Sequence, residues 1–363
     1  MAALLMTGFP GFLGSALLPK LLARREGMRA ACLVQQHHLA TARARLHQIE
    51  AMHPSTRGRV VLVEGDITAA DLGLAPDALA ALDDVTEVWH LAAVYDLTVP
   101  EAVARRVNVD GTARVLEFCG SRRQLHRLQY VSTCYVSGAY EGEFREDSLD
   151  EGQAFRNHYE STKFEAELLV RKAMADGLPA TVYRPGIVVG DSLTGETQKY
   201  DGPYFLATFL QRQPRLAVVP AVGSIERVPV SLVPRDFVVD AMDELSVMED
   251  SVGRTCALTD PAPPTVRELV DTFARHLGKT VFWLPLPLRP TRWAVDTVPG
   301  LERLLGLPAE GLDYFASKTS YSTATTDALL SSTTLRCPRF PDYAGRLLDF
   351  KVAHPEVHAE AMT

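Results

Sequence analysis

Three glycines near the start of the chain, spaced three residues apart, constrain the fold more than any other feature. They lie in Thr7-Gly8-Phe9-Pro10-Gly11-Phe12-Leu13-Gly14, which follows the apolar run 3–6 and precedes the run 15–23, where apolar residues recur at helical spacing. A strand, a glycine turn and a helix in this order are typical of a dinucleotide-binding turn, in which the glycines permit close backbone approach to the pyrophosphate. We expect seven residues of this turn to contact a cofactor: Thr7, Gly8, Pro10, Gly11, Phe12, Leu13 and Gly14.

The same rhythm of strand and helix continues through the first half of the chain. Short apolar runs typical of buried strands occur at 3–6, 28–34, 59–63, 85–90, 127–132 and 180–184, with helical patterns between several of them, for example at 102–119. Strands that alternate with helices predict a parallel sheet covered on both faces. We therefore expect an α/β protein with a Rossmann-type, doubly wound parallel sheet.

The second half of the chain predicts a smaller, interleaved C-terminal substrate lobe. Prolines and aromatic residues interrupt the rhythm at 186–230, after which we expect strands at 227–233 and 255–258 and helices at 234–248 and 265–277. We assign 1–185 to the dinucleotide-binding domain, to which 227–258 returns. The smaller lobe then comprises 186–226 and 259–363.

A tyrosine and a lysine four residues apart form the second informative motif. Tyr159 and Lys163 lie within the helical pattern 158–171, so their side chains share one helix face. A neighbouring ammonium favours the phenolate and lowers the pKa of the phenol, which lets the tyrosine donate a proton to a developing alkoxide. Thr133 ends a predicted strand and offers a second hydroxyl. Such a pair is common by chance, but beside a dinucleotide site it predicts hydride transfer to or from a carbonyl.

The end of the second predicted strand bears on which dinucleotide is bound. An acidic residue there would accept hydrogen bonds from the adenosine ribose and favour NAD. Here the strand ends in Leu33-Val34-Gln35-Gln36-His37-His38, and no carboxylate follows until Glu50. We therefore prefer NADP (NADPH), with Arg43, Arg45 or His37 near the 2′-phosphate, and keep NAD as an alternative. A solvated helix face explains these arginines equally well.

These motifs together resemble the extended short-chain dehydrogenase/reductase family. The resemblance covers most of the chain and rests on the glycine turn, Gly65-Asp66, 89–93, 108–112, Ser132-Thr133, the Tyr159/Lys163 pair and 183–186. It implies that Thr133, Tyr159 and Lys163 are catalytic and that Asn108 supports them. It also implies further cofactor contacts: Asp66 and Ile67 at the adenine, Ala92 and Ala93 at the middle, and Pro185, Gly186 and Ile187 at the nicotinamide. Gln35, in the cofactor region, departs from the arginine common in this family, which weakens the preference for NADP.

Within that family the chain is most similar to fatty acyl-CoA reductases and thioester-reductase domains. The local features are 11–15, 92–95, 183–191 and Tyr200-Asp201-Gly202-Pro203. The resemblance implies NADPH-dependent reduction of a hydrophobic acyl thioester, bound to CoA or an acyl carrier protein, to an aldehyde or alcohol. It places Val94, Tyr95, Cys134 and Tyr135 on the substrate side. A reductase or dehydrogenase of a free aldehyde, ketone or secondary alcohol is the main alternative, and a non-catalytic NAD(P)-binding sensor is a weaker one.

Composition excludes several other classes of protein. The net charge of −8 offers no basic surface for nucleic acid. Five scattered cysteines suit a reducing compartment rather than a disulfide framework, and no histidine or cysteine spacing predicts a metal site. No stretch approaches the roughly 20 apolar residues of a membrane span, and the apolar start lacks the basic residues of a signal peptide. We expect a cytoplasmic protein, and its oligomeric state stays open.

Two apolar segments are the only sequence evidence on the substrate. The ranges 200–210 and 283–307 are rich in aromatic residues, leucine and proline, and we hypothesise that they line a channel for an aliphatic substrate. Ordinary packing within the lobe explains them equally well. Trp293 with Leu304 and Leu305 could instead form an apolar surface for a membrane or a second copy.

Overall fold

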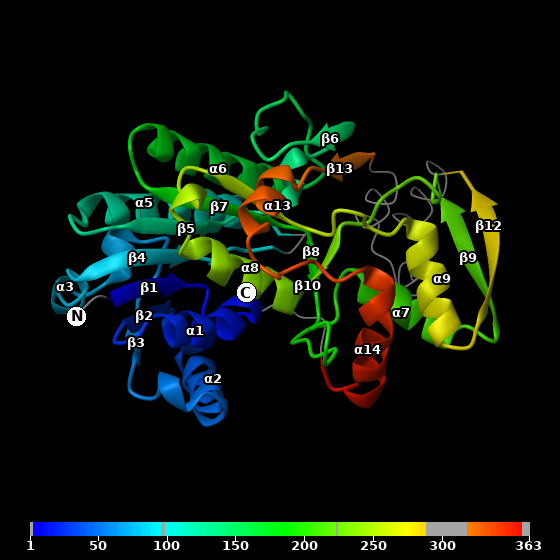
Figure 1. Cartoon of the computed structure of the whole chain (residues 1–363), viewed down its shortest axis with the longest axis horizontal. Helices are drawn as coiled ribbons and strands as arrows, with labels where there is room; N and C mark the ends of the chain where they lie inside the picture. Colours follow the sequence, from blue (N-terminus) through cyan, green and yellow to red (C-terminus); the bar gives the residue numbers. More distant parts are fainter. Residues whose placement is uncertain (1–2, 96–98, 223, 288–317, 358–363) are drawn as a thin grey trace.

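One parallel sheet forms the centre of the larger lobe (Figure 1). The computed structural model describes residues 3–95, 99–222, 224–287 and 318–357. Within these ranges seven strands follow the order β3-β2-β1-β4-β5-β7-β11, and every neighbouring pair is parallel. The strands are β1 (Ala3–Thr7), β2 (Arg29–Val34), β3 (Val60–Glu64), β4 (Val85–His90), β5 (Arg127–Val131), β7 (Ala180–Pro185) and β11 (Thr255–Leu258). This is the predicted doubly wound sheet, and its order reverses at β1.

Helices cover both faces of this sheet, as the alternation of side chains along β1 requires. Leu4 and Met6 of β1 pack with the helices of one face, and Ala3 and Leu5 pack with those of the other. The first face carries α1 (Phe12–Arg24), α2 (Leu39–Met52) and α8 (Arg235–Ser246), and the second carries α5 (Gly111–Ser121) and α6 (His158–Ala175).

Shorter elements connect these main ones. The predicted helix at 102–119 is divided into α4 (Glu101–Ala104), a π-helical segment η4 (Arg105–Asp110) and α5. The remaining short elements are η1 (Gln36–His38), η2 (Pro54–Thr56), η3 (Ala70–Gly73), α3 (Pro76–Ala80), η5 (Cys134–Ser137), β6 (Gly142–Phe144) and η6 (Glu249–Ser251).

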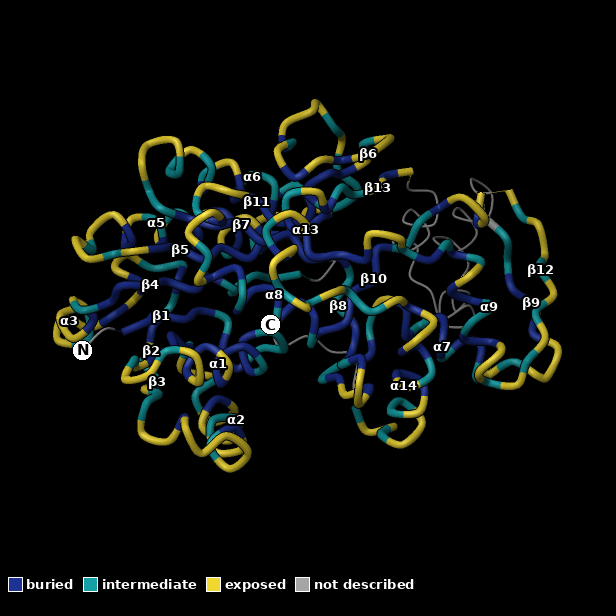
Figure 2. Tube along the Cα trace, viewed as in Figure 1, coloured by how far each residue is buried: buried dark blue, intermediate teal, exposed yellow. Residues whose placement is uncertain are grey.

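The smaller lobe has its own apolar core, which appears as the dark interior at the right of Figure 2. Buried rings such as Tyr204, Phe273 and Phe340 fill it. Its elements are β8 (Ile187–Val189), α7 (Pro203–Arg212), β9 (Leu216–Val222), β10 (Leu232–Pro234), α9 (Val266–His276), β12 (Thr280–Leu286) and α14 (Phe340–Ala353). Strands β9 and β12 pair in parallel, as do β8 and β10. Two later elements, β13 (Thr319–Tyr321) and α13 (Ala324–Leu330), return to the larger lobe, where they contact β6 and β11 respectively.

The prediction of a strand at 227–233 is confirmed only for its last two residues. A turn occupies 225–227, where Arg227 N donates to Ser224 O, and the regular strand β10 begins only at Leu232. Pro229 has no N–H and cannot contribute a ladder hydrogen bond as a donor. β10 pairs with β8 and not with the main sheet, whereas α8 and β11 do pack into the larger lobe. The domain boundaries given above stay a prediction.

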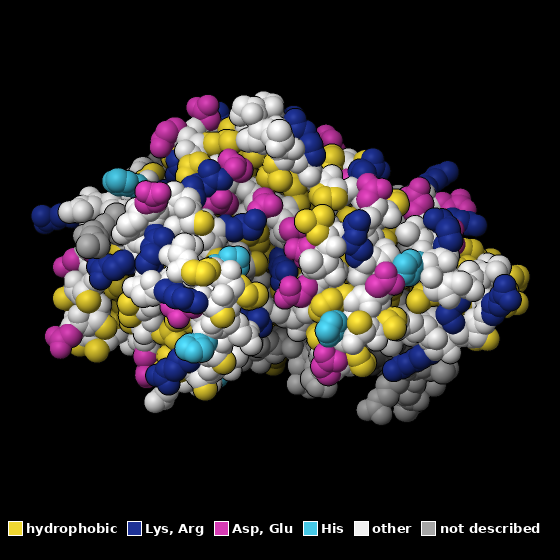
Figure 3. All heavy atoms as spheres, turned by 60° about the horizontal axis from the view of Figure 1, so that its bottom comes forward, with side chains coloured by type: hydrophobic (Ala, Val, Ile, Leu, Met, Phe, Trp, Pro, Cys, Tyr) yellow, Lys and Arg dark blue, Asp and Glu magenta, His cyan; other side chains and the backbone are white. Residues whose placement is uncertain are grey.

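The structure also bears on the expectations about surface charge, membrane spans, metal sites and cysteines. Acidic and basic side chains are interspersed on the face shown in Figure 3. Among the described residues no helix is both long and apolar enough to cross a membrane, and no cluster of histidine, cysteine or acidic side chains is arranged to hold a metal ion. All five cysteines are free thiols. The expectations for Trp293, Leu304 and Leu305, and for the channel wall beyond residue 287, lie outside the described residues.

A buried ionic network joins α6 to the ends of β5 and β7. The Glu167 carboxylate is fully buried and accepts hydrogen bonds from Ser132 Oγ (2.6 Å), Arg184 Nη2 (2.7 Å) and Arg171 Nε (3.0 Å). Burial alone would raise the pKa of Glu167, but Arg184, Arg171 and Ser132 hold that pKa below its usual value. The charged form is therefore the one that the fold stabilises.

Replacing Glu167 by alanine should lower the free energy of unfolding by about 3–5 kcal/mol at neutral pH, because two arginines would then share a buried site without their carboxylate. This stabilisation should be complete above the ordinary glutamate pKa of about 4.3 and be lost as the pH falls below it. Denaturant unfolding measures both effects. The matched control is Glu165→Ala on the same helix, whose partly exposed pair with Arg105 should be worth less than about 1 kcal/mol. Equal losses in the two variants would contradict the assignment.

Candidate active site

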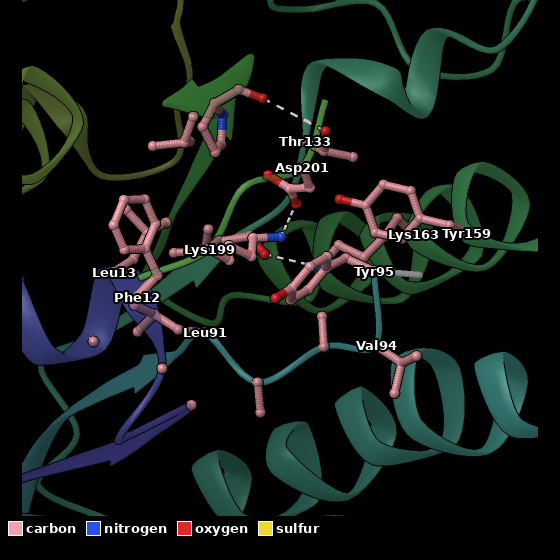
Figure 4. Close-up of a pocket in the computed structure, with 18 of the residues that line it drawn as sticks. Phe12, Leu13, Leu91, Val94, Tyr95, Thr133, Tyr159, Lys163, Lys199 and Asp201 are labelled. Carbon is pink, nitrogen blue, oxygen red and sulfur yellow. Dashed lines mark hydrogen bonds and ion pairs between the residues drawn. The ribbon is translucent and has the colours of Figure 1, made fainter. Parts of the chain in front are cut away.

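A cavity of about 1510 Å³ opens at the carboxyl edge of the main sheet, next to the position where the strand order reverses. This is the place where open α/β sheets bind ligands. The glycine turn, the ends of β2, β4, β5 and β7, helix α6 and the smaller lobe all contribute to its lining. We call it the central cavity, and Figure 4 shows the part around Tyr159.

The glycine turn is packed too tightly for side chains. Gly8 has φ +84°, and a Cβ on it would lie 2.8 Å from the backbone nitrogen of Ala92. A Cβ on Gly11 or Gly14 would lie 2.7 or 2.8 Å from the carbonyl oxygen of Gly8. Helix α1 begins at Phe12, so the unpaired N–H groups of its first turn lie at the cavity. The glycines thus permit both the turn itself and the approach of a phosphate.

Thr7 ties the glycine turn to the loop after β4. Its Oγ1 accepts hydrogen bonds from the backbone N–H groups of Leu91 (3.2 Å) and Ala92 (3.1 Å) and lies 2.8 Å from His90 Nδ1. His90 Nε2 lies 3.0 Å from Thr112 Oγ1. Burial, together with the charge of Lys163, lowers the pKa of His90 to about 3, so the imidazole is neutral at physiological pH.

Of the three residues kept as candidates for a 2′-phosphate contact, Arg45 and His37 line the cavity and Arg43 does not. Arg45, His37, His38 and Arg106 line the cavity, whereas Arg43 does not and is exposed. Two residues along an α-helix are about 200° apart around its axis, so α2 can present only one of the two arginines to the cavity.

Gln35 and Asp66 interact with each other at the end of β2. Gln35 and Ile67 line the cavity, while Asp66 does not. Burial raises the pKa of Asp66, but hydrogen bonds from Thr68 and from the Gln35 side chain, with the charge of Arg106, leave it below the ordinary value. The Gln35 side chain is therefore engaged with the carboxylate that was expected at the adenine.

Thr133, Tyr159 and Lys163 come together as predicted. Helix α6 starts at His158, where the Asn157 side chain caps it by accepting from Glu160 N (2.9 Å), so Tyr159 lies in the first turn. The hydroxyls of Tyr159 and Thr133 lie in the same part of the cavity, which both residues line (Figure 4). Thr133 Oγ1 also lies 3.5 Å from the carbonyl oxygen of Pro185.

Burial dominates the ionisation of this group. It raises the pKa of Tyr159 to about 12, even though the hydrogen bond with Thr133 acts in the opposite direction. It lowers the pKa of Lys163 to about 8. Lys163 Nζ donates to Val131 O (2.8 Å) and Tyr130 Oη (3.1 Å). The prediction that the ammonium lowers the phenol pKa is therefore wrong for the net shift, because burial of the phenol is the largest cause and raises its pKa.

Asn108 is a positioning residue. It is buried and does not line the cavity. Its Oδ1 accepts from Val94 N (2.9 Å), and its Nδ2 donates to Val94 O (3.0 Å) and to Thr162 Oγ1 (3.0 Å). The π-helical segment η4 therefore clamps the loop after β4 to the helix that carries Tyr159.

The predicted substrate-side residues divide into two groups. Val94, Tyr95 and Tyr135 line the cavity. Cys134 does not: its buried thiol donates to Arg184 O (3.0 Å), and burial raises its pKa. Ala92, Ala93, Pro185, Gly186 and Ile187 all line the cavity at the positions expected for the cofactor.

Several lining residues escaped the sequence analysis. Tyr321 reaches the cavity because β13 pairs with β6, and its hydroxyl lies 3.0 Å from Ser137 Oγ. No local signal in the sequence connects positions 184 residues apart. Lys199 lines the cavity two residues before Asp201, which also lines it and belongs to the motif Tyr200-Asp201-Gly202-Pro203 that the sequence did highlight. Apolar side chains missed by the sequence include Val99, Val103 and Val107; Phe205 and Leu206 fall within a segment that it singled out.

The chain is similar in sequence and in fold to known proteins. The family model described as Male sterility protein matches residues 6–242. The chain is 30% identical over 283 residues to a component of the linear gramicidin synthase of Brevibacillus parabrevis, covering 74% of this chain and 5% of that protein. It is also 30% identical over 321 residues to the isonitrile lipopeptide synthase of Streptomyces coeruleorubidus, covering 86% of this chain and 21% of that protein. The chain thus spans a small part of the length of these relatives.

A solved structure extends the likeness to nearly the whole chain. The terminal R domain from the myxalamid PKS-NRPS biosynthetic pathway superposes with a TM-score of 0.83 at 27% identity, covering 98% of this chain and 91% of that one. The family match over residues 6–242 includes both the glycine turn and the Thr133/Tyr159/Lys163 group, which line the same cavity. The chain belongs to the Male sterility protein family and is an NAD(P)-dependent oxidoreductase of the extended short-chain dehydrogenase/reductase type.

Proposed function

We propose that this protein is an NADPH-dependent reductase that converts a hydrophobic acyl thioester, linked to CoA or to an acyl carrier protein, to an aldehyde or alcohol. One observation carries the proposal: Thr133, Tyr159 and the glycine turn line the same central cavity. The relatives named as gramicidin and lipopeptide synthases, and the myxalamid R domain, support a thioester as the substrate. The cytoplasmic location stays a prediction.

The residues of the cavity fit a dinucleotide phosphate. The first-turn amides of α1 and the glycine turn suit the pyrophosphate, and Pro185 to Ile187 suit the nicotinamide. Arg45 with His37 and His38 offers positive or hydrogen-bonding groups at the adenosine end, where β2 ends without a carboxylate. This arrangement favours NADPH, which supplies the hydride when bound.

The chemistry of the protein side chains follows from their protonation states. With a pKa of about 12, Tyr159 is protonated at neutral pH and can act as the acid in a reduction. Thr133 and Tyr159 donate hydrogen bonds to the carbonyl oxygen, where negative charge grows as hydride adds to the carbon, and Tyr159 then transfers its proton. Lys163, cationic below about pH 8, stabilises the phenolate that results.

A thioester would first give a hemithioacetal, which collapses when the C–S bond breaks and releases an aldehyde and a free thiol. A second hydride and proton would yield the alcohol. The apolar wall made by Val103, Phe205 and Leu206 suits an aliphatic acyl chain. The second candidate, a reductase of free aldehydes or ketones, would use the same three side chains and is separated by the assay below.

We expect NADPH oxidation with octanoyl-CoA to release free thiol, followed by absorbance at 340 nm and thiol titration. Tyr159→Phe should lower kcat by about 10²–10⁴-fold, because general acid catalysis contributes on that order, while the Kd of NADPH changes little. Tyr140→Phe, which alters a tyrosine outside the cavity lining, is the matched control and should keep full activity. Turnover of aldehydes alone would favour the second candidate, and equal activity in Tyr159→Phe would refute the catalytic assignment.

Arg45→Ala should weaken NADPH binding about tenfold, since a charge-assisted hydrogen bond contributes about 1.5–3 kcal/mol and 1.4 kcal/mol is a factor of ten. The affinity for NADH, which lacks the 2′-phosphate, should stay the same. Fluorescence titration with both cofactors measures this. Arg43→Ala on the same helix is the control, because Arg43 does not line the cavity. Parallel losses for NADPH and NADH would argue against a 2′-phosphate contact.

The affinity for NADPH should fall as the pH rises through about 8. Burial lowers the pKa of Lys163 to about that value, so the positive charge near the cofactor site is full below it and lost above it. Titrations between pH 6.5 and 9.5 should show the inflection in the wild type. Lys163→Met should bind more weakly at neutral pH and show no inflection near pH 8. An unchanged inflection in that variant would assign the titration to another group.

A further inference from the structure

A charged pair lies in the wall of the central cavity, on the segment that joins β8 to α7. Lys199 and Asp201 form an ion pair, and the Lys199 ammonium lies 3.8 Å from the centre of the Tyr95 ring, which belongs to the loop after β4. The Lys199 side chain is only 14% exposed and that of Asp201 34%. All three residues line the cavity. The catalytic scheme above uses none of them.

This pair lies close to the reactive group. Figure 4 shows Lys199 and Asp201 in the same space as the hydroxyls of Tyr159 and Thr133. Tyr95 is near enough to Tyr159 to contribute to its raised pKa. Next to Asp201, a Cβ on Gly202 would lie 3.4 Å from the Ile187 side chain, and Phe205 and Leu206 of the following helix also line the cavity. A ligand whose carbonyl reaches Tyr159 therefore occupies the same cavity as the pair.

The charges of the pair define the ligand chemistry that it can bind. The ammonium of Lys199 and the carboxylate of Asp201 together carry no net charge, so the pair favours neither an anionic nor a cationic ligand. Among the described residues, Lys199 Nζ contacts the Asp201 carboxylate and the face of the Tyr95 ring, which leaves one of its three N–H groups for a ligand. The Asp201 carboxylate has further acceptor positions. A neutral group with one acceptor and one donor side by side fits both, and a secondary amide is such a group.

We infer that Lys199 and Asp201 recognise a secondary amide of the substrate beside the thioester, with Lys199 donating to the amide oxygen and Asp201 accepting from the amide N–H. The inference rests on the proposed function and deepens it. In an apolar wall such a pair can discriminate strongly, because a substrate without the amide gives no compensating hydrogen bonds. The amide could lie on the thiol side, as in a pantetheine arm, or on the acyl side, as in a peptide.

Three thioesters separate these sources: S-butyl octanethioate, which has no amide, octanoyl-N-acetylcysteamine, with an amide on the thiol side, and the S-butyl thioester of N-hexanoylglycine, with an amide on the acyl side. The readout is the ratio of kcat/KM for each amide substrate to that for S-butyl octanethioate. Lys199→Met should lower at least one of these ratios about tenfold, since a hydrogen bond to a charged group contributes about 1.5–3 kcal/mol. The substrate whose ratio falls identifies the side of the amide.

Asp201→Asn provides a second variant of nearly the same shape and should lower the same ratio. Lys20→Met is the matched control, because Lys20 forms an ion pair with Asp240 outside the cavity lining, and its ratios should equal those of the wild type. If neither Lys199→Met nor Asp201→Asn changes these kcat/KM ratios, the inference is refuted while the proposed function stands. If the wild type reduces none of the three thioesters and no acyl-CoA, the proposed function fails and the inference fails with it.

Discussion

The buried carboxylate of Glu167 holds together the three parts of the chain that form the reactive end of the cavity. It sits on the helix that carries Tyr159 and Lys163, binds Arg184 next to Pro185 and accepts a hydrogen bond from Ser132. A buried charge of this kind cannot be left without its partners, so the three elements are fixed in one arrangement. The positions of Thr133 and Tyr159 thus depend on Glu167 and Arg184, neither of which lines the cavity.

Removal from water also sets the protonation states at the site. It makes the phenol of Tyr159 a weaker acid and the ammonium of Lys163 a stronger one, and it keeps His90 neutral between Thr7 and Thr112. The neutral imidazole can then serve as a hydrogen-bonding spacer between the glycine turn and the helix behind it. Burial therefore keeps Tyr159 protonated as a proton donor, and it keeps His90 neutral as a fixed link between Thr7 and Thr112.

Local patterns predicted most of the larger lobe because strand and helix periodicities are short-range properties. The six strands from β1 to β7 that enter the main sheet and the glycine turn appear where the sequence indicates them, within a residue or two. What local patterns did not settle has long-range causes. Which of Arg43 and Arg45 lines the cavity depends on the rotation of α2 about its axis. The direction of the Tyr159 pKa shift depends on burial, and Tyr321 reaches the site only through a strand pairing.

The pairing of β13 with β6 has a consequence for how the protein is made. The cavity draws on residues from Thr7 to Tyr321, so its last wall is synthesised long after its first. During translation, which proceeds from the amino end, the larger sheet can assemble while this wall is still missing. Until the ribosome has added β13, the cavity lacks the part of its wall that Thr319 and Tyr321 form, and the side chains next to that gap are more exposed to water.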